Sequence, residues 1–199
     1  MTRIKQLLLF VSLVVAGSAF GAQPGDTVAN FTLTDHLGVS HELHQYADKK
    51  AVVLFVQGNG CPIVRNGLHT YKELRDKYQD KGVAFLMINS NLQDNQKRIA
   101  KEADEFDIDF PILVDEDQKV GEALRFERTA DTFVIDPKTW KIAYRGALDD
   151  RLGYETQKFS ASHNYAADAL DDVLAGKPVD VTQIEAKGCL VNIPALSGG

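Results

Sequence analysis

Cysteine is scarce in this sequence, and the scarcity limits what can hold the chain together. Cys61 and Cys189 are its two cysteines among 199 residues. Two cysteines in a domain of this size are too few for a structural disulfide framework. A hydrophobic core must therefore stabilise the fold, and a content of 44% hydrophobic residues is sufficient for one compact domain.

Long hydrophobic runs are also missing, because no apolar stretch reaches the ~20 residues that a membrane-spanning helix needs. The apolar run over residues 7–16 follows two positive charges and precedes a stretch of small residues. This order is typical of a secretory signal peptide. We therefore predict a signal peptide over residues 1–22 and a periplasmic or secreted domain over residues 23–199, with an uncleaved anchor as the alternative.

Positive charge is in deficit, since 22 Lys and Arg residues face 28 Asp and Glu residues and the formal net charge is −6. Loss of Arg3 and Lys5 with the signal peptide removes two positive charges and leaves the mature chain at −8. Such an acidic chain is a poor partner for nucleic acid or an anionic membrane. We expect no nucleic acid as a partner, and no membrane after signal cleavage.

The stretch around Cys61 is the most informative part of the sequence. The six apolar residues Ala51 to Val56 predict a strand buried on both faces. A turn rich in glycine follows, and Pro62 is favoured at the first position of a helix. Cys61 would then lie at a helix N-terminus, where free amides and the helix dipole favour its thiolate. The alternative is that Cys61 is a small buried hydrophobic residue.

The other hydrophobic patterns predict strands that alternate with helices. They indicate a strand over 30–35 with a return over 39–43, a helix from residue 62, a strand over 83–88, a helix from about 94, a short strand over 110–114, a helix over 118–126, a hairpin over 132–144 and a helix over 162–175. A proline in the 110–114 strand suits a sheet edge or the start of a strand. The strand, helix and strand over residues 51–88 form a parallel βαβ unit, so the predicted fold class is α/β.

This order of elements, with a cysteine after the first core strand, resembles the thioredoxin fold. That fold has three layers, with a central mixed sheet, helices on both faces and here an N-terminal β-hairpin extension. The stretches that carry a closer resemblance are Phe31–Asp35 with Gly38, Asn59–Val64, Ile88–Asn91, Leu113–Gln118, Tyr144–Asp150 and Gly188–Cys189. They are similar to the redoxin or peroxiredoxin-like (AhpC/TSA) family, in a subgroup with a single active-site-type cysteine. The resemblance implies an exported thiol oxidoreductase with an antioxidant role and no cofactor.

The sequence departs from the well-known branches of this superfamily at the reactive positions. Val64 stands where thioredoxins carry their second cysteine, which excludes a disulfide across one helical turn. Gly58 stands where peroxiredoxins carry the hydroxyl that helps to hold the peroxide, and Leu54 where they carry a proline. Ala130 follows Thr129 in place of a cis-proline, and we expect this peptide to be trans. The chain is therefore predicted to be neither a typical peroxidase nor a CxxC disulfide exchanger.

Cys61 is the predicted redox-active nucleophile, and Cys189 either resolves its oxidised form or is an independent thiol. The supporting residues expected around them are Asn59, Gly60, Pro62, Arg65 and Thr129. Asn59 is predicted to cap the helix. Arg65 lies one turn after Cys61, where it either favours the thiolate or binds an anion, or is simply a solvated residue.

Several polar residues have plainer interpretations. Arg128 lies near the arginine position of peroxiredoxins but out of register, and is otherwise a surface charge. Asp149 and Asp150 are predicted to be solvated carboxylates in a loop. His41 and His44 fit a surface turn better than a metal site, since no second cysteine lies near Cys61 in the sequence, and no metal is predicted.

Two functions remain open from the sequence. The first is a thiol-dependent oxidoreductase whose partners are a thiol reductant and an oxidised protein or small-molecule substrate. The second is a non-catalytic binding or metal-delivery module that has kept the redoxin fold.

Overall fold

The computed structural model describes residues 22–151, 158 and 160–196. The predicted signal peptide therefore lies, apart from Ala22, outside the described residues. Within the described ranges, every helix is too short or too polar to cross a membrane.

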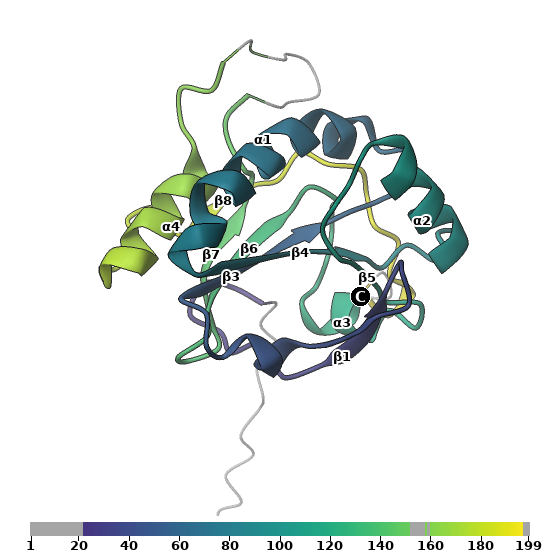
Figure 1. The fold of residues 1–199 in the computed structure, drawn as a ribbon, viewed down its shortest axis with the longest axis horizontal. Helices are drawn as coiled ribbons and strands as arrows, with labels where there is room; N and C mark the ends of the chain where they lie inside the picture. Colours follow the sequence, from purple (N-terminus) through teal and green to yellow (C-terminus); the bar gives the residue numbers. More distant parts are fainter. Residues whose placement is uncertain (1–21, 152–157, 159, 197–199) are drawn as a thin grey trace, which may run out of the picture.

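The framework is an eight-stranded mixed sheet with the strand order β2-β1-β5-β4-β3-β6-β7-β8 (Figure 1). Its strands are β1 (Thr32–Asp35), β2 (Ser40–Glu42), β3 (Ala51–Val56), β4 (Val83–Asn89), β5 (Ile112–Val114), β6 (Thr132–Asp136), β7 (Lys141–Gly146) and β8 (Gln183–Ile184). The helices are α1 (Pro62–Tyr78), α2 (Gln96–Glu105), α3 (Lys119–Ala123) and α4 (Tyr165–Ala175). Strands β3, β4 and β5 are parallel to one another, whereas β6 is antiparallel to both β3 and β7. This arrangement confirms the predicted thioredoxin-like α/β fold.

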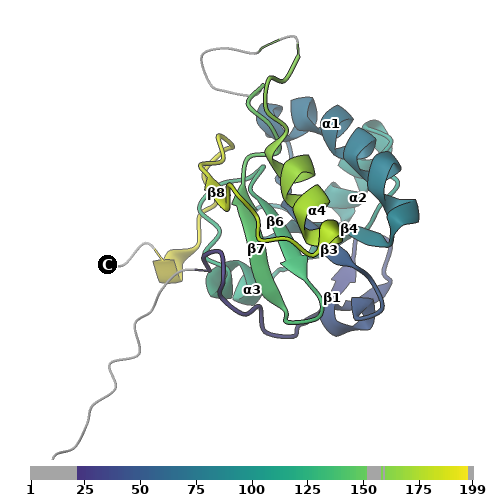
Figure 2. The ribbon, with the colours of Figure 1, turned by 90° about the vertical axis from the view of Figure 1, so that its left-hand side faces the viewer.

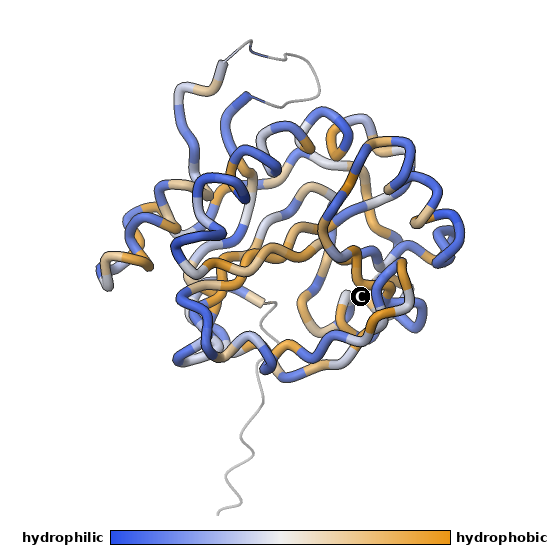
Figure 3. The backbone as a smooth tube through the Cα atoms, viewed as in Figure 1, coloured by the Kyte–Doolittle hydropathy of each residue, from blue (hydrophilic) through white to orange (hydrophobic). Residues whose placement is uncertain are grey.

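Two hydrophobic clusters lie on the two faces of the sheet. Helices α1, α2 and α4 cover one face, and the short α3 with the segment after Ala22 covers the other (Figures 1 and 2). Alternate residues of β3 enter alternate clusters, since Val53 and Phe55 pack under α1 while Val52 and Leu54 face the other layer. The central strands are therefore hydrophobic on both sides, and Figure 3 shows hydrophobic residues along them and many hydrophilic residues along α1 and α2.

The short strand β5 decides between the two positions that its proline allowed, a sheet edge or the start of a strand. It pairs with β1 on one side and β4 on the other, so it is not an edge strand. Pro111 immediately precedes it, where the missing N–H removes no ladder hydrogen bond. The predicted N-terminal hairpin, β1 and β2, extends the sheet beyond β5, and β2 forms one edge of the sheet.

The chain after α4 returns across the molecule instead of ending at the helix. Its first part forms β8, which is parallel to β7. It then continues along the end of the sheet toward α3, as the yellow trace in Figure 1 shows. We call residues 186–193 of this return the C-terminal tail, and it carries Cys189.

Candidate redox site

Cys61 lies where β3 ends and α1 begins. It is the N-cap residue of α1 with extended backbone angles, and Pro62 occupies the first helical turn. Gly60 precedes it with a φ of 74°, a left-handed conformation that glycine adopts without strain. The sequence prediction for this turn is therefore confirmed, and the Cys61 sulfur is placed at a helix N-terminus.

Two buried carboxylates fix the turn in front of Cys61. Asp94 accepts the N–H of Asn59 at 3.0 Å, and Glu102 accepts the N–H of Gly60 with both of its oxygens, at 3.0 and 2.9 Å. The predicted helix cap by Asn59 is wrong, because its side-chain oxygen accepts a hydrogen bond from the Gln57 amide at 3.0 Å instead. The backbone N–H groups of the turn are therefore held from outside, by α2 and the loop before it.

Arg65 forms an ion pair with the same carboxylate, that of Glu102. Its guanidinium donates to both oxygens of Glu102, at 3.3 and 3.2 Å, and stacks over the ring of Phe106 at 4.5 Å. The sequence left open that Arg65 is simply a solvated residue. These contacts with Glu102 and Phe106 exclude that alternative. The most direct role of Arg65 is to neutralise the Glu102 charge behind the turn.

Thr129 connects the two cysteines. Its hydroxyl oxygen accepts the N–H of Cys189 at 2.9 Å and lies 3.1 Å from the sulfur of Cys61. Since the oxygen already accepts the amide proton, the hydroxyl can direct its own proton at the Cys61 sulfur. The peptide between Thr129 and Ala130 is trans, as expected, and Ala130 has a φ of 59°.

The two sulfur atoms meet although 128 residues separate them. Cys189 Sγ lies 2.7 Å from Cys61 Sγ, and both are free thiols in this structure. The tail is aligned by main-chain hydrogen bonds from Thr129 N–H to the Cys189 carbonyl, at 2.8 Å, and from Val191 N–H to the Glu127 carbonyl, at 2.9 Å. The structure therefore brings together the two predicted catalytic cysteines and Thr129 in one site.

The two thiols differ in exposure and acidity. Cys61 is buried, with 4% of its surface exposed, while Cys189 is partly exposed. Burial opposes ionisation of Cys61, but hydrogen bonds from Cys189, Thr129 and the Val64 amide outweigh it and lower the pKa of Cys61. Burial and the neighbouring Cys61 sulfur raise the pKa of Cys189 to about 11. Cys61 is thus the stronger acid of the pair, and Cys189 is the more exposed residue.

Two glycines make room for this contact. A Cβ atom on Gly58 would lie 2.6 Å from the Thr129 methyl group, and one on Gly188 would lie 1.7 Å from the Thr129 carbonyl oxygen. The backbone at Gly58 and the backbone at Gly188 therefore both approach Thr129 closely. At position 58 the threonine or serine typical of peroxiredoxins would collide with Thr129, which gives a physical reason for its replacement here.

Arg128 also belongs to the tail contact. Its guanidinium donates to the Gly188 carbonyl at 3.2 Å, and Arg128 itself forms a β-bridge with Leu190. Arg128 therefore helps to hold the tail. The sequence had suggested either a peroxiredoxin-like arginine or a surface charge, and neither interpretation included this role.

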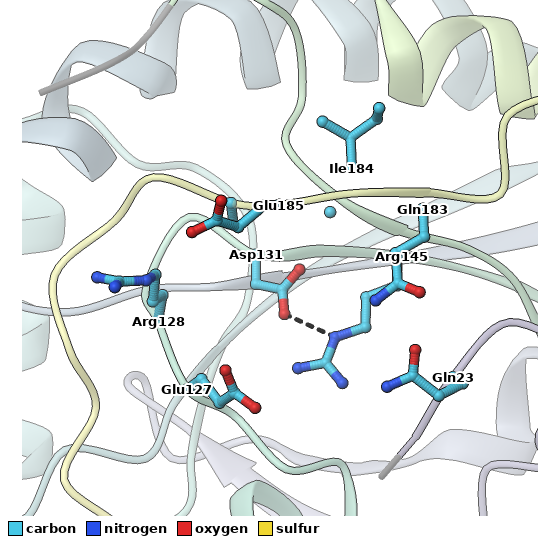
Figure 4. A pocket seen from close by; sticks show the side chains of 10 residues that line it. Gln23, Glu127, Arg128, Asp131, Arg145, Gln183, Ile184 and Glu185 are labelled. Atoms are coloured by element: carbon cyan, nitrogen blue, oxygen red, sulfur yellow. Dashed lines mark hydrogen bonds and ion pairs between the residues drawn. The ribbon is translucent and has the colours of Figure 1, made fainter.

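A polar cavity of about 180 Å³ lies beside β8 and the start of the tail (Figure 4). The residues that line this cavity include the buried ion pair between Arg145 and Asp131, with a nitrogen–oxygen distance of 2.9 Å. Arg145 also donates to the carbonyls of Ala22 and Arg125, both at 2.8 Å. Burial raises the pKa of Asp131 to about 6, although Arg145 opposes this shift. The pair ties the start of β6, next to Thr129, to the segments around it.

The loop after β7 differs from its prediction. Asp149 is not solvated but buried, where it accepts hydrogen bonds from the Thr70 hydroxyl, at 3.3 Å, and from the Arg151 N–H, at 2.9 Å. Asp150 accepts the N–H groups of Ser162 and His163 and therefore also has a structural role.

The histidines have structural partners as well. His41 lies between Asp35 and Tyr46, and His44 stacks on Trp140 with ring centroids 4.1 Å apart. Among the described residues, no three His, Cys, Asp or Glu side chains are grouped as metal ligands would be.

Sequence reasoning missed Glu102, Asp94 and Arg145. All three are charged residues that tertiary packing buries, and charged residues are ordinarily exposed. Arg145 gave one usable signal, because it follows the apolar residues of the predicted strand 141–144. The two carboxylates gave none, since they lie 33 and 41 residues after Cys61 in an ordinary polar segment.

The chain has recognisable relatives among known proteins. The family model described as "AhpC/TSA family" matches residues 24–145. The thiol-disulfide oxidoreductase ResA of Geobacillus kaustophilus is 31% identical over 112 residues, which cover 56% of this chain and 63% of that protein. The thioredoxin-like protein YneN of Bacillus subtilis is 29% identical over 141 residues, which cover 69% of this chain and 76% of that protein. The chain thus spans a little less than two thirds of the length of the ResA relative.

Solved structures share the architecture over more of the chain. A conserved protein from Geobacillus kaustophilus has a TM-score of 0.78 and 31% identity, covering 86% of this chain and 93% of its own. A hypothetical protein from Sinorhizobium meliloti has a TM-score of 0.75 and 28% identity, covering 84% and 93%. The peroxidoxin BcpB of Mycobacterium tuberculosis, at 23% identity and a TM-score of 0.56, covers 77% and 94% and shares the fold.

Proposed function

We propose that this chain, which belongs to the AhpC/TSA family, is a thiol-based oxidoreductase that cycles between a Cys61–Cys189 dithiol and the corresponding disulfide. The observation that carries the proposal is the 2.7 Å approach of the two sulfur atoms beside the Thr129 hydroxyl. The names of the ResA and YneN relatives support thiol chemistry.

The acidity of the two thiols assigns their roles. Cys61 is the better nucleophile near neutral pH, because only the thiolate attacks and its pKa is lowered. Its thiolate attacks an oxidised sulfur or a peroxide oxygen, giving a mixed disulfide or a sulfenate while a thiolate or hydroxide leaves. Cys189 then attacks the Cys61 sulfur, the leaving group departs with the Cys189 proton, and the intramolecular disulfide forms. Two equivalents of an external thiol return it to the dithiol.

The second candidate is a non-catalytic binding module that has kept the redoxin fold. The deep burial of Cys61 favours it, since a buried cysteine with no accessible partner is chemically inert. The partly exposed Cys189 weighs against it, because oxidising equivalents can reach the pair through this residue.

We further propose export to an extracytoplasmic compartment, where a disulfide can persist.

The test is a peptide map of the reduced protein after treatment with diamide. The wild type should yield one cross-linked peptide pair containing Cys61 and Cys189, with the loss of two hydrogen atoms. The control variant Cys189→Ser should yield none, and it should instead retain a thiol or an adduct at Cys61. Recovery of two unmodified thiols from the wild type, reactive toward iodoacetamide only after denaturation, would support the binding module instead.

A further inference from the structure

The C-terminal tail occupies the backbone edge beside Cys61 as an extended peptide would. Residues 127–129 pair with it in antiparallel fashion, through the Arg128–Leu190 bridge and the two main-chain hydrogen bonds at Thr129 and Val191. A third bond runs from the Cys189 N–H to the Thr129 hydroxyl. Addition of an extended strand to an open edge is a common way to bind a polypeptide, and here the chain supplies that strand itself.

The tail is anchored by the residues that follow Leu190. Val191 and Ile193 are buried in the hydrophobic cluster on the α3 face of the sheet. Gln118 donates its side-chain amide to the Asn192 carbonyl at 2.8 Å. Leu190, which directly precedes these anchors, points outward with 73% of its surface exposed. The tail therefore packs as part of the fold, and the alternation of exposed and buried residues over 190–193 matches that of a paired strand.

We propose that the tail closes the strand-pairing edge to external polypeptides, so that the redox partners of this protein are small thiols and small disulfides. This inference rests on the proposed function for its chemistry, but the closure of the edge does not depend on it. A small thiol needs no main-chain pairing and can reach the partly exposed Cys189. An extended peptide would have to displace three hydrogen bonds and two buried side chains first.

The reduction that follows from this geometry balances with two monothiols. A first thiolate attacks the Cys189 sulfur of the disulfide, the bond to Cys61 breaks, and Cys61 leaves as a thiolate beside Thr129. A second thiolate attacks the external sulfur of the mixed disulfide, and Cys189 leaves and takes up a proton from solvent. Two electrons pass from two thiols to the protein disulfide, and one small disulfide is released.

The direct test uses a fluorescent peptide with the sequence of residues 186–193 in which serine replaces the cysteine. The reduced wild-type protein should not bind it, because the tail already fills the edge. In Gly188→Ala the new Cβ would collide with the Thr129 carbonyl, which forces the tail away, and binding measured by anisotropy should strengthen at least tenfold. Leu190→Ala is the matched control, since this exposed side chain lies on the same strand and should leave binding at the wild-type level.

A second readout compares rates. The oxidised wild type should react with glutathione at least as fast as with the cysteine form of the same peptide, and Gly188→Ala should shift this ratio at least tenfold toward the peptide. Tight binding of the peptide to the wild type, or faster reduction by the peptide than by glutathione, would overturn the inference. If Gly188→Ala does not fold, these two wild-type measurements still decide it. Failure of the disulfide to form with diamide would remove the proposed function, and the binding measurement would still test the closed edge.

Discussion

The two halves of the site are built in different ways. The turn that presents Cys61 is a contiguous stretch, residues 57–65, fixed by buried carboxylates on α2 and before it. The tail that presents Cys189 has little regular structure and is positioned by main-chain pairing and two apolar anchors. The turn with the reactive sulfur is thus held by buried charged side chains, whereas the tail with its partner is held by main-chain pairing and hydrophobic burial. The two halves should therefore respond to different substitutions.

The largest expected effect is on the tail. Ile193→Ala removes a buried side chain, and we expect the free energy of unfolding to fall by about 2–5 kcal/mol. Because the anchor lies four residues from Cys189, the rate of Cys61–Cys189 cross-linking by diamide should fall as well. Urea unfolding and a timed peptide map measure these quantities. The control is Val181→Ala, since Val181 is an exposed residue of the same C-terminal region. An equal loss of unfolding free energy in Val181→Ala would show that the tail is not held by its buried side chains.

An intermediate effect is expected at the turn. Glu102→Gln keeps an acceptor but removes the charge that pairs with Arg65 and holds the Gly60 amide, so we expect a loss of about 1–3 kcal/mol. Hydrogen exchange of the Gly60 amide should accelerate while that of Val191 in the tail stays unchanged. Glu105→Gln, on the exposed side of the same helix, should change neither. Equal acceleration in both halves would show that they are not independent.

The smallest effect should appear at the contact between the halves. Thr129→Val removes a hydroxyl that lowers the pKa of Cys61, so that pKa should rise. Ultraviolet absorbance of the thiolate against pH in the reduced protein measures it, because Cys189 titrates only at a pKa of about 11. Arg65→Gln should change the value less, since Glu102 engages this arginine. A larger pKa shift in Arg65→Gln than in Thr129→Val would show that Arg65 stabilises the Cys61 thiolate.

Most of the fold could be predicted because its signals are local. The continuous apolar runs of β3 and β4 and the periodic α1 define a buried βαβ unit, and Pro62 marks where its helix begins. The position of β5 inside the sheet could not be predicted, because strand order depends on which segments pair. Asp149 was misassigned for the same reason, since burial of a polar loop residue depends on distant partners such as Thr70.

By itself the sequence determined that a cysteine stands at the start of a helix after a buried strand, because neighbouring residues decide turns and helix starts. Only the tertiary structure decided that Cys189 lies against it, since that contact joins segments 128 residues apart through backbone pairing and buried side chains. It also decided which carboxylates support the turn and that the tail covers the edge beside the reactive sulfur. Such facts depend on the packing of the whole chain, and no local pattern of residues encodes them.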